Sequence, residues 1–311
     1  MKQKNKIRKI LITGSSGMIG TRLFGQLLEK GYMVTGFDRK KNKWSPKLNK
    51  KTIFGDLLSK KDIEKIPKKN IDLIIHLAAN PRVYELVLKP DLALENIITL
   101  YNVINFAKKN KVKNIIFSSS REVYGNRKAM VSEEDNIDIK LCESPYAASK
   151  ISGEALIISF MKCYKINYII CRFSNVYGMY DESRRFFPLL ISQMKKNHKV
   201  NIYGREKVLD FTYLDDCVAG VIKCVENFSK AKNSFLNIAS GRGENLVKVA
   251  RILKRELKSK SEIKISQSLT GEVKKFIADT SKAKKLLGYS PKYSIKDGIK
   301  MSIDWYSKHI K

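Results

Sequence analysis

The fold of this chain is decided by the stretch Gly14-Ser15-Ser16-Gly17-Met18-Ile19-Gly20. A short apolar run over residues 9–13 precedes it and suits a buried strand. An apolar periodicity typical of a helix follows it and ends near Gly31. Glycines at such a junction permit a tight turn and let backbone N–H groups reach a diphosphate, whose charge a helix N-terminus favours. The stretch therefore predicts a strand–loop–helix unit that binds a dinucleotide.

Further strand-like runs, with helical patterns between them, extend this unit. They are Met33–Phe37, a short run from Thr52, Ile71–Leu77, Val112–Phe117 and Tyr168–Phe173. Buried strands that alternate with helices predict a parallel sheet with right-handed crossovers. The expected fold class is α/β, a doubly wound parallel sheet followed by a smaller C-terminal α/β lobe.

An acidic residue ends the second predicted strand. Asp38 lies 18 positions after Gly20, where a carboxylate can accept both hydroxyls of an adenine ribose and repel a 2′-phosphate. This favours NAD over NADP, although the cations Arg39 and Lys40 follow. Asp56, at the end of the third strand, is placed to meet the adenine edge.

A second informative stretch is Ser144-Pro145-Tyr146-Ala147-Ala148-Ser149-Lys150. Ser144 can cap a helix whose first turn accepts Pro145, and Tyr146 and Lys150 then lie one turn apart on one face. An ammonium beside a phenol stabilises the phenolate, so we expect Lys150 to lower the pKa of Tyr146 from about 10. The pair could take a proton from an alcohol, although most such pairs are ordinary helix neighbours.

The composition limits the kinds of partner. A net charge of +31 suits an anionic partner, but the lysines are scattered and no arginine-rich patch with aromatic residues occurs, so we expect neither nucleic acid nor membrane. No apolar run is long enough for a membrane helix, and the start lacks a signal peptide's apolar segment. Five cysteines without C-x-x-C spacing predict buried thiols in a cytoplasmic protein, with no metal site.

In combination, these stretches resemble the extended short-chain dehydrogenases/reductases, in particular NAD-dependent nucleotide-sugar epimerases and dehydratases similar to UDP-glucose 4-epimerase. The resemblance covers almost the whole chain. The matching pieces are Gly14/Gly17/Gly20, Asp38, Gly55-Asp56-Leu57, His76-Leu77-Ala78-Ala79, Asn96, Ser118-Ser119-Ser120, Val123-Tyr124-Gly125, Tyr146/Lys150 and Arg172-Phe173-x-Asn175-Val176-Tyr177-Gly178. It implies a Rossmann fold, NAD as cofactor and a nucleotide-diphosphate sugar as substrate.

The resemblance also implies residue roles. The catalytic residues would be Ser120, Glu122, Tyr146 and Lys150. The cofactor would be bound by Gly14, Gly17, Met18, Ile19, Gly20, Asp38, Arg39, Asp56, Leu57, Leu77, Ala78, Ala79, Asn96, Ser118, Tyr146, Lys150 and Phe173. The substrate would be bound by Asn80, Arg82, Ser120, Arg121, Glu122, Tyr146, Asn175, Tyr203 and Arg205.

Domain organisation and assembly follow from the same resemblance. We expect residues 1–173, with 208–239 returning to the sheet, to form the NAD-binding domain, and 174–207 with 240–311 to form the substrate-binding lobe. Asp215 would cap a helix of the returning segment, and the last helix of the lobe would end near Trp305. In relatives, the helices corresponding to 96–106 and 146–161 pack in a dimer, and Ile97, Leu100 and Leu156 suggest a homodimer here.

Glu122 leaves two chemistries open. In the family's shared step, Tyr146 deprotonates a sugar hydroxyl while hydride passes to the nicotinamide, and a 4-epimerase returns that hydride to the opposite face. A 4,6-dehydratase or glucuronate decarboxylase resembles this chain in having Glu two positions after the serine. The thymidine-sugar dehydratases, however, carry Asp where this chain has Arg121, and a guanidinium cannot act as an acid. The length and the sequence Ala78-Ala79-Asn80-Pro81 also favour the 4-epimerase.

Two further points stay open at this level. The family often has arginine before its Asp-Phe pair, where this chain has Leu209, so Arg205, Lys207 or the pair Arg184-Arg185 would have to replace it. Neither the nucleotide nor the sugar can therefore be named. A non-catalytic role in cofactor sensing or nucleic-acid binding is a minor alternative, against which the intact serine, tyrosine and lysine argue.

Overall fold

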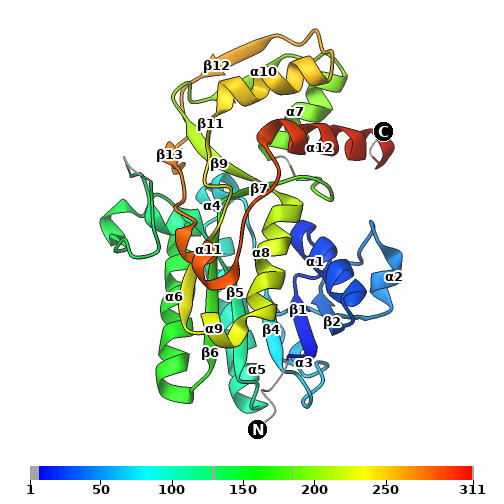
Figure 1. Cartoon of the computed structure of the whole chain (residues 1–311), viewed down its shortest axis with the longest axis vertical. Helices are drawn as coiled ribbons and strands as arrows, with labels where there is room; N and C mark the ends of the chain where they lie inside the picture. Colours follow the sequence, from blue (N-terminus) through cyan, green and yellow to red (C-terminus); the bar gives the residue numbers. More distant parts are fainter. Residues whose placement is uncertain (1–6, 128–129, 184, 310–311) are drawn as a thin grey trace.

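The larger part of the molecule is built on a seven-stranded parallel sheet (Figure 1). The computed structural model describes residues 7–127, 130–183 and 185–309. The sheet order is β10-β6-β5-β4-β1-β2-β3, and every neighbouring pair is parallel. The strands are β1 (Lys9–Thr13), β2 (Met33–Asp38), β3 (Thr52–Phe54), β4 (Leu73–His76), β5 (Asn114–Ser120), β6 (Asn167–Phe173) and β10 (Ser234–Ile238). This is the strand order of a doubly wound dinucleotide-binding sheet with one strand added, so the predicted fold class is confirmed.

Helices cover both faces of this sheet. One face is covered by α1 (Met18–Glu29), α8 (Leu214–Glu226) and α11 (Ser281–Leu287), and the other by α5 (Asp91–Lys109) and α6 (Pro145–Tyr164). Shorter helices are α2 (Pro46–Asn49), α3 (Lys60–Ile63), α4 (Val83–Leu88) and α9 (Phe228–Ala231). In β1, Ile10 and Ile12 join the first core and Leu11 joins the second. Both faces of the strand are thus buried, which explains its unbroken apolar sequence.

A smaller lobe lies beyond one end of this sheet (Figure 1). Its strands are β7 (Asn175–Tyr177), β8 (Val200–Tyr203), β9 (Val208–Tyr213), β11 (Gly243–Asn245), β12 (Ile263–Ser266) and β13 (Lys275–Phe276). Its helices are α7 (Phe186–Lys195), α10 (Leu246–Glu256) and α12 (Ile295–His309). A separate hydrophobic core, which includes Phe187, Phe211 and Ile299, holds them together.

The structure corrects several details of the sequence interpretation. β9, predicted to belong to the NAD-binding domain, pairs with strands of the smaller lobe. α11, predicted to belong to the lobe, joins the core of the larger sheet. The division otherwise stays a proposal. The residue that precedes α8 is Tyr213, so Asp215 lies within the first turn and is not the predicted cap. Its carboxylate pairs with Arg22. The last helix continues past Trp305 to His309.

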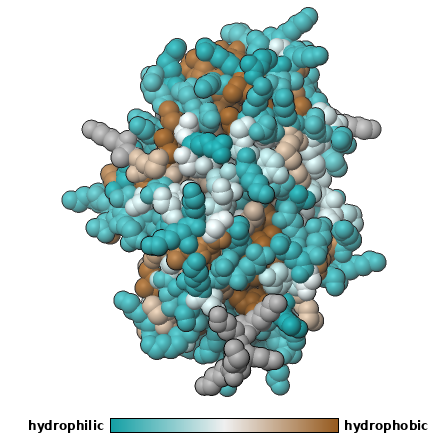
Figure 2. Space-filling view, viewed as in Figure 1, coloured by the Kyte–Doolittle hydropathy of each residue, from teal (hydrophilic) through white to brown (hydrophobic). Residues whose placement is uncertain are grey.

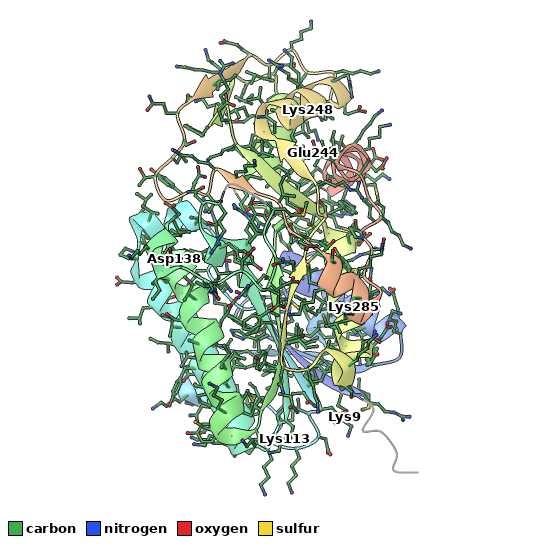
Figure 3. All side chains as sticks on the ribbon, turned by 60° about the vertical axis from the view of Figure 1, so that its left-hand side comes forward. Lys9, Lys113, Asp138, Glu244, Lys248 and Lys285 are labelled. Carbon is green, nitrogen blue, oxygen red and sulfur yellow. The ribbon has the colours of Figure 1, made fainter. Side chains whose placement is uncertain are left out.

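The predictions of buried thiols and of scattered surface lysines can be compared with the structure. Cys171, Cys217 and Cys224 are buried as predicted, but Cys163 is exposed and Cys142 is half-buried, because helix and loop positions there face outward. Lys248 lies in the smaller lobe, Lys285 beside the larger sheet, and Lys9 and Lys113 at the opposite end of the molecule (Figure 3). Figure 2 shows a mostly hydrophilic face with only scattered hydrophobic patches. Over the residues described, no helix combines the length and apolar character needed to span a bilayer.

Candidate active site

The predicted site residues follow the carboxyl ends of the parallel strands. Gly14 comes after β1, Asp38 ends β2, Leu77 follows β4 and Ser120 ends β5. Because parallel strands end at one edge of a sheet, these residues share the edge where such folds bind ligands. The 3₁₀ turn η1 (Arg121–Tyr124) continues directly from β5 on this edge.

The glycine loop has the shape that a dinucleotide requires. A Cβ on Gly14, whose φ is +72°, would lie 2.6 Å from Ala78 N, and one on Gly20 would lie 2.1 Å from Gly14 O. Both glycines are therefore needed by the chain itself. Gly17 is exposed, and a Cβ there would meet its nearest neighbour at an ordinary 3.4 Å. Its bare backbone opens onto solvent beside the start of α1, which fits the close approach of a diphosphate.

The Asp38 carboxylate is engaged by two backbone groups. Its Oδ2 accepts the N–H of Ser16 at 2.9 Å and its Oδ1 accepts the N–H of Lys40 at 2.9 Å. Ser16 also donates its hydroxyl to Lys40 O at 2.8 Å. Asp38 thus fixes the glycine loop to the turn after β2 while its partly exposed oxygens keep further acceptor sites. Arg39 is exposed, and Asp56 accepts the N–H of Leu58 at 2.9 Å.

An aromatic cluster that the sequence reasoning missed joins the segment after β2 to α12. Trp44, in the segment after Asp38, packs edge-on against Trp305 of α12 with ring centroids 4.8 Å apart. Tyr180 contacts both rings, at 6.4 Å from Trp44 and 5.3 Å from Trp305. Three segments distant in sequence therefore meet in this cluster, and no local periodicity could indicate this.

The predicted helix start is confirmed, and it carries Tyr146 and Lys150 into the protein. Ser144 accepts the N–H of Ala147 at 3.2 Å, and Pro145 is the first helical residue. Tyr146 is 8 % exposed and Lys150 is 4 % exposed. Lys150 Nζ donates to Ser118 O at 2.7 Å and lies 5.7 Å from the centroid of the Tyr146 ring.

The expected lowering of the tyrosine pKa does not occur within this chain alone. Burial raises the pKa of Tyr146 to about 12, opposed by hydrogen bonding to Ser120 and reinforced by the charge of Glu122. Burial also lowers the pKa of Lys150 to about 8, and Glu154 opposes that shift. The sequence interpretation was wrong here because Lys150 points at a backbone carbonyl and because desolvation of the phenol outweighs a charge at that distance.

A buried ion pair beneath the site was also missed. Arg172 on β6 donates to Glu154 through Nε at 3.0 Å and Nη2 at 2.8 Å, and both side chains are 3 % exposed. Ser119 adds a hydrogen bond to the same carboxylate at 2.6 Å. Glu154 lies one helical turn after Lys150, a spacing that could have drawn attention to it. The pair connects β5, β6 and α6 directly behind the predicted catalytic residues.

A second buried ion pair stands at the site itself. Arg121 Nη2 lies 2.7 Å from Glu122 Oε1, with residue exposures of 7 % and 3 %. The guanidinium lies 5.7 Å from the ring centroid of Phe276. Burial raises the pKa of Glu122, and Arg121 opposes this. Ser120 Oγ accepts the N–H of Glu122 at 3.2 Å, which fixes the turn.

A cavity of about 850 Å³ lies between the segment at Asn126 and Glu143 and the smaller lobe. Charged side chains line it from both parts of the molecule, among them Glu143, Arg205, Lys207 and Glu272. Lys207 is nearly buried and pairs with Glu272. Of the other cations that could replace the absent arginine, Arg185 pairs with Asp181 at 2.8 Å, and Arg184 lies outside the described residues.

Several other predicted residues have local partners. Asn96 accepts the N–H of Asn80 at 2.7 Å and donates to its carbonyl at 3.2 Å, so its amide is satisfied by backbone. The Asn80 amide donates to Leu92 O and to Glu95, both on α5. Asn175 donates to Asp210 O at 3.1 Å. Arg82 pairs with Glu85 on the surface at 3.3 Å, and Tyr203 is 39 % exposed.

The remaining predicted cofactor contacts lie along the same edge. Met18 and Ile19 begin α1 and are half-buried, and Leu77 donates its N–H to Thr13 O. Leu57 and Phe173 are buried, and Ala79 is half-buried. His76 is buried against Thr13, and burial followed by the charge of Lys150 lowers its pKa to about 3. His76 is therefore a neutral core residue at the end of β4.

Comparison with known proteins identifies the family. A model described as the NAD dependent epimerase/dehydratase family matches residues 10–239. The chain belongs to this family. It is 30 % identical over 306 residues to a putative UDP-glucose 4-epimerase of Methanocaldococcus jannaschii, covering 95 % of this chain and 97 % of that one.

Members with different chemistry are similar over equally long stretches. The structure of a UDP-glucuronic acid 4-epimerase from Bacillus cereus, in complex with UDP-glucuronic acid and NAD, superposes with a TM-score of 0.89 at 30 % identity, covering 96 % of this chain and 99 % of that one. A human dTDP-D-glucose 4,6-dehydratase is 27 % identical over 325 residues, covering 97 % and 91 %. The family and its enzymatic nature are thus established, whereas the reaction within the family is not.

Proposed function

We propose that this enzyme is an NAD-dependent nucleotide-sugar 4-epimerase. The observation that supports it best is the Arg121–Glu122 pair at 2.7 Å. A dehydratase needs an acid and a base beside the sugar, but here the first of these positions holds a guanidinium, which cannot release a proton at working pH. An epimerase needs neither group for proton transfer. A uronate decarboxylase or a dehydratase is the second candidate, because Glu122 is buried and its raised pKa suits a base.

In the proposed mechanism Tyr146 is the base and Ser120 steadies the oxygen that it deprotonates. Both residues face the sheet edge at the end of β5, and Lys150 stands behind them. Bound NAD would supply a hydride acceptor and donor for the same carbon, and the positive charge of its oxidised ring would lower the pKa of the phenol. The buried tyrosine then exchanges one proton with the sugar oxygen in each direction, so its charge is restored at the end of the cycle.

The same proposal assigns the binding residues. The open backbone at Gly17 and the start of α1 would hold the cofactor diphosphate, and the partly exposed oxygens of Asp38 would accept the ribose hydroxyls. The cavity lined by Arg205 and Lys207 would hold the nucleotide end of the substrate, since its cations suit a diphosphate. Location in the cytoplasm is part of this proposal.

The cofactor assignment predicts a preference that calorimetry can measure. We expect NAD⁺ to bind at least about tenfold more tightly than NADP⁺, because a 2′-phosphate would approach the Asp38 carboxylate. In Asp38→Asn the preference should shrink, since the repulsion is removed. The matched control is Asp56→Asn, which should leave the ratio of the two affinities unchanged. Equal affinities in the wild-type protein would show that Arg39 and Lys40 dominate.

The assembly assignment predicts a homodimer through α5 and α6. A shallow apolar hollow on these helices is lined by Ile97 and Leu156, and Ile98 is 38 % exposed nearby. Leu100, predicted as a contact, is buried in the core and takes no part. We expect light scattering to give a dimer at micromolar concentration and Ile98→Glu to give a monomer. Leu88→Glu, an exposed change on α4, is the control, and a monomeric wild type would refute the assignment.

Glu122→Gln separates the two candidate reactions. If the enzyme is an epimerase, Glu122 only shapes the pocket, and turnover should fall by about tenfold or less. A positioned base is worth about 10²–10⁴-fold, so a larger loss would favour the dehydratase or decarboxylase. The thermal unfolding midpoint of the variant should be recorded alongside, because the change also affects the ion pair with Arg121.

A further inference from the structure

One end of the molecule gathers positive charge from segments that are distant in sequence. Because the larger sheet is parallel, the segments that lead into β10, β6, β5, β4 and β1 all lie at this end, side by side. Figure 3 shows Lys9 and Lys113 there. These five segments hold twelve cations and one carboxylate. The cations, here called the basic end, are Arg8, Lys9, Lys68, Lys69, Lys108, Lys109, Lys111, Lys113, Lys162, Lys165, Lys230 and Lys232.

Carboxylates do not neutralise the basic end. The ion pairs among the residues that the structure describes include none of its cations. Its one acid, Asp72, accepts the backbone N–H groups of Arg8 and Lys9 at 2.9 Å. The cations are exposed, except that Lys9 is half-buried. The basic end therefore projects a positive field into solvent.

Helix termini explain only part of this charge. Lys108, Lys109 and Lys162 lie in the last turns of α5 and α6, where cations offset the helix dipole. Lys68 and Lys113, in contrast, lie outside any helix, in the segments before β4 and β5. The dipole gives no reason for such positions, so the basic end suits an anion outside the protein.

Two large apolar side chains stand exposed among these cations. Met33, the first residue of β2, is 62 % exposed and is the neighbour of Lys9 across the sheet. Tyr164 ends α6 and is 40 % exposed, and Lys108 Nζ lies 4.1 Å from the centroid of its ring. Apolar and aromatic side chains beside lysines are typical of a surface that enters the headgroup layer of a bilayer.

The shape and composition of the basic end favour a bilayer over a nucleic acid. Five strands side by side make it about 20 Å wide, at about 4.8 Å per strand. Its charge is almost entirely lysine, which attracts phosphate as a point charge. Proteins that bind single strands stack bases on aromatic side chains, and those that read duplexes insert a helix or strand into a groove. The loops and helix ends here offer neither device.

We propose that the basic end docks the enzyme on a membrane surface that carries anionic phospholipids. Each lysine within about 10 Å of such a surface, the Debye length at about 0.1 M salt, adds to the attraction. The predicted active site follows the opposite ends of the strands, so docking leaves it open to solvent. The sequence pattern alone predicts no membrane partner, because these lysines are scattered along the chain until the parallel sheet brings them together.

Co-sedimentation of the full chain with lipid vesicles tests the proposal. We expect binding to vesicles of phosphatidylcholine mixed with phosphatidylserine, and none to phosphatidylcholine alone. The affinity should fall at least about tenfold between about 0.1 and 1 M salt, since the Debye length shrinks from about 10 to about 3 Å. No binding to the anionic vesicles would overturn the proposal. Tighter binding of single-stranded RNA at equal phosphate concentration would also overturn it, by assigning the basic end to nucleic acid.

Two quadruple variants separate the basic end from the overall charge, which both lower equally. The first changes exposed lysines of the basic end and consists of Lys68→Gln, Lys69→Gln, Lys113→Gln and Lys232→Gln. The second changes exposed lysines of the smaller lobe and consists of Lys248→Gln, Lys258→Gln, Lys260→Gln and Lys264→Gln. The first should weaken vesicle binding at least about tenfold and the second less than about threefold. Equal losses would refute the role of the basic end.

A fluorescent label reports which end meets the membrane. Cys163 is exposed and lies in the basic end, between Lys162 and Tyr164. Acrylodan on Cys163, with Cys142→Ser to remove the half-buried thiol, should emit further to the blue on anionic vesicles because it enters a less polar layer. The same label on Lys248→Cys, with both native thiols replaced by serine, should not shift. An equal or larger shift at position 248 would contradict the proposed orientation, and none of these measurements depends on turnover.

Discussion

Replacing Tyr146 by Phe is expected to lower kcat by about 10³–10⁴-fold, the largest effect on activity that we predict. The phenol oxygen is the proposed acceptor of the sugar proton, and Phe removes it while keeping the ring that is packed in α6. The unfolding midpoint should change little, because the ring accounts for most of the buried surface. Turnover is to be measured at saturating nucleotide-sugar, so that the loss is read in the chemical step.

Tyr164→Phe is the matched control for this variant. Tyr164 lies at the far end of the same helix, is 40 % exposed and packs against Phe160. Its change should leave kcat within about twofold of the wild type, as expected for a surface position. A fully active Tyr146→Phe enzyme would contradict the proposed mechanism.

The raised pKa of Tyr146 gives the sign of the pH dependence. The base must be a phenolate, and a phenol whose pKa lies above neutrality is deprotonated more as the pH rises. The wild-type kcat/KM should therefore increase with pH from the neutral range upward. The residual rate of Tyr146→Phe should lack this rise. A wild-type rate that falls over the same range would show that another group limits catalysis.

Replacing Arg172 by Met is expected to lower the free energy of unfolding by about 3–5 kcal/mol. The change leaves the Glu154 carboxylate buried without its ion-pair partner, and its remaining hydrogen bond from Ser119 does not compensate for that. Arg172 also lies over the rings of Tyr124 and Phe235 at 4.7 and 4.6 Å, contacts that Met preserves only in part. Urea denaturation of the purified variant measures the effect.

The double variant Arg172→Met with Glu154→Leu separates charge burial from packing. Removing both charges should recover most of the lost stability, because replacement of a buried pair by apolar residues is often neutral. A double variant as unstable as Arg172→Met would assign the loss to packing instead. A loss below about 1 kcal/mol in Arg172→Met alone would refute the role of the pair.

Sequence reasoning succeeded where the cause is local or periodic. The strand ends at Thr13 and Phe173 and the cap at Ser144 follow from short patterns that tertiary structure left unchanged. Because parallel strands end at one edge, ordering the strands was enough to gather the predicted site residues there.

It failed where the cause is a contact between distant segments. The pairing of Glu154 with Arg172 spans a helix and a strand, and burial of Tyr146 depends on everything packed around it. The same holds for α11, which returns to the larger sheet, and for the meeting of Trp44 with Trp305. No window of sequence contains such information.

The most direct test of the central proposal is to follow one reaction in deuterated water by NMR and mass spectrometry. The enzyme, NAD and UDP-glucose are incubated, and the sugar product is isolated. A 4-epimerase gives the C4 isomer with the mass of the substrate and no deuterium at C5. The hydrogen on C4 returns as hydride and never exchanges with the solvent, and the C5 hydrogen is not removed. Loss of water, loss of carbon dioxide from a uronate run in parallel, or deuterium at C5 would contradict the proposal.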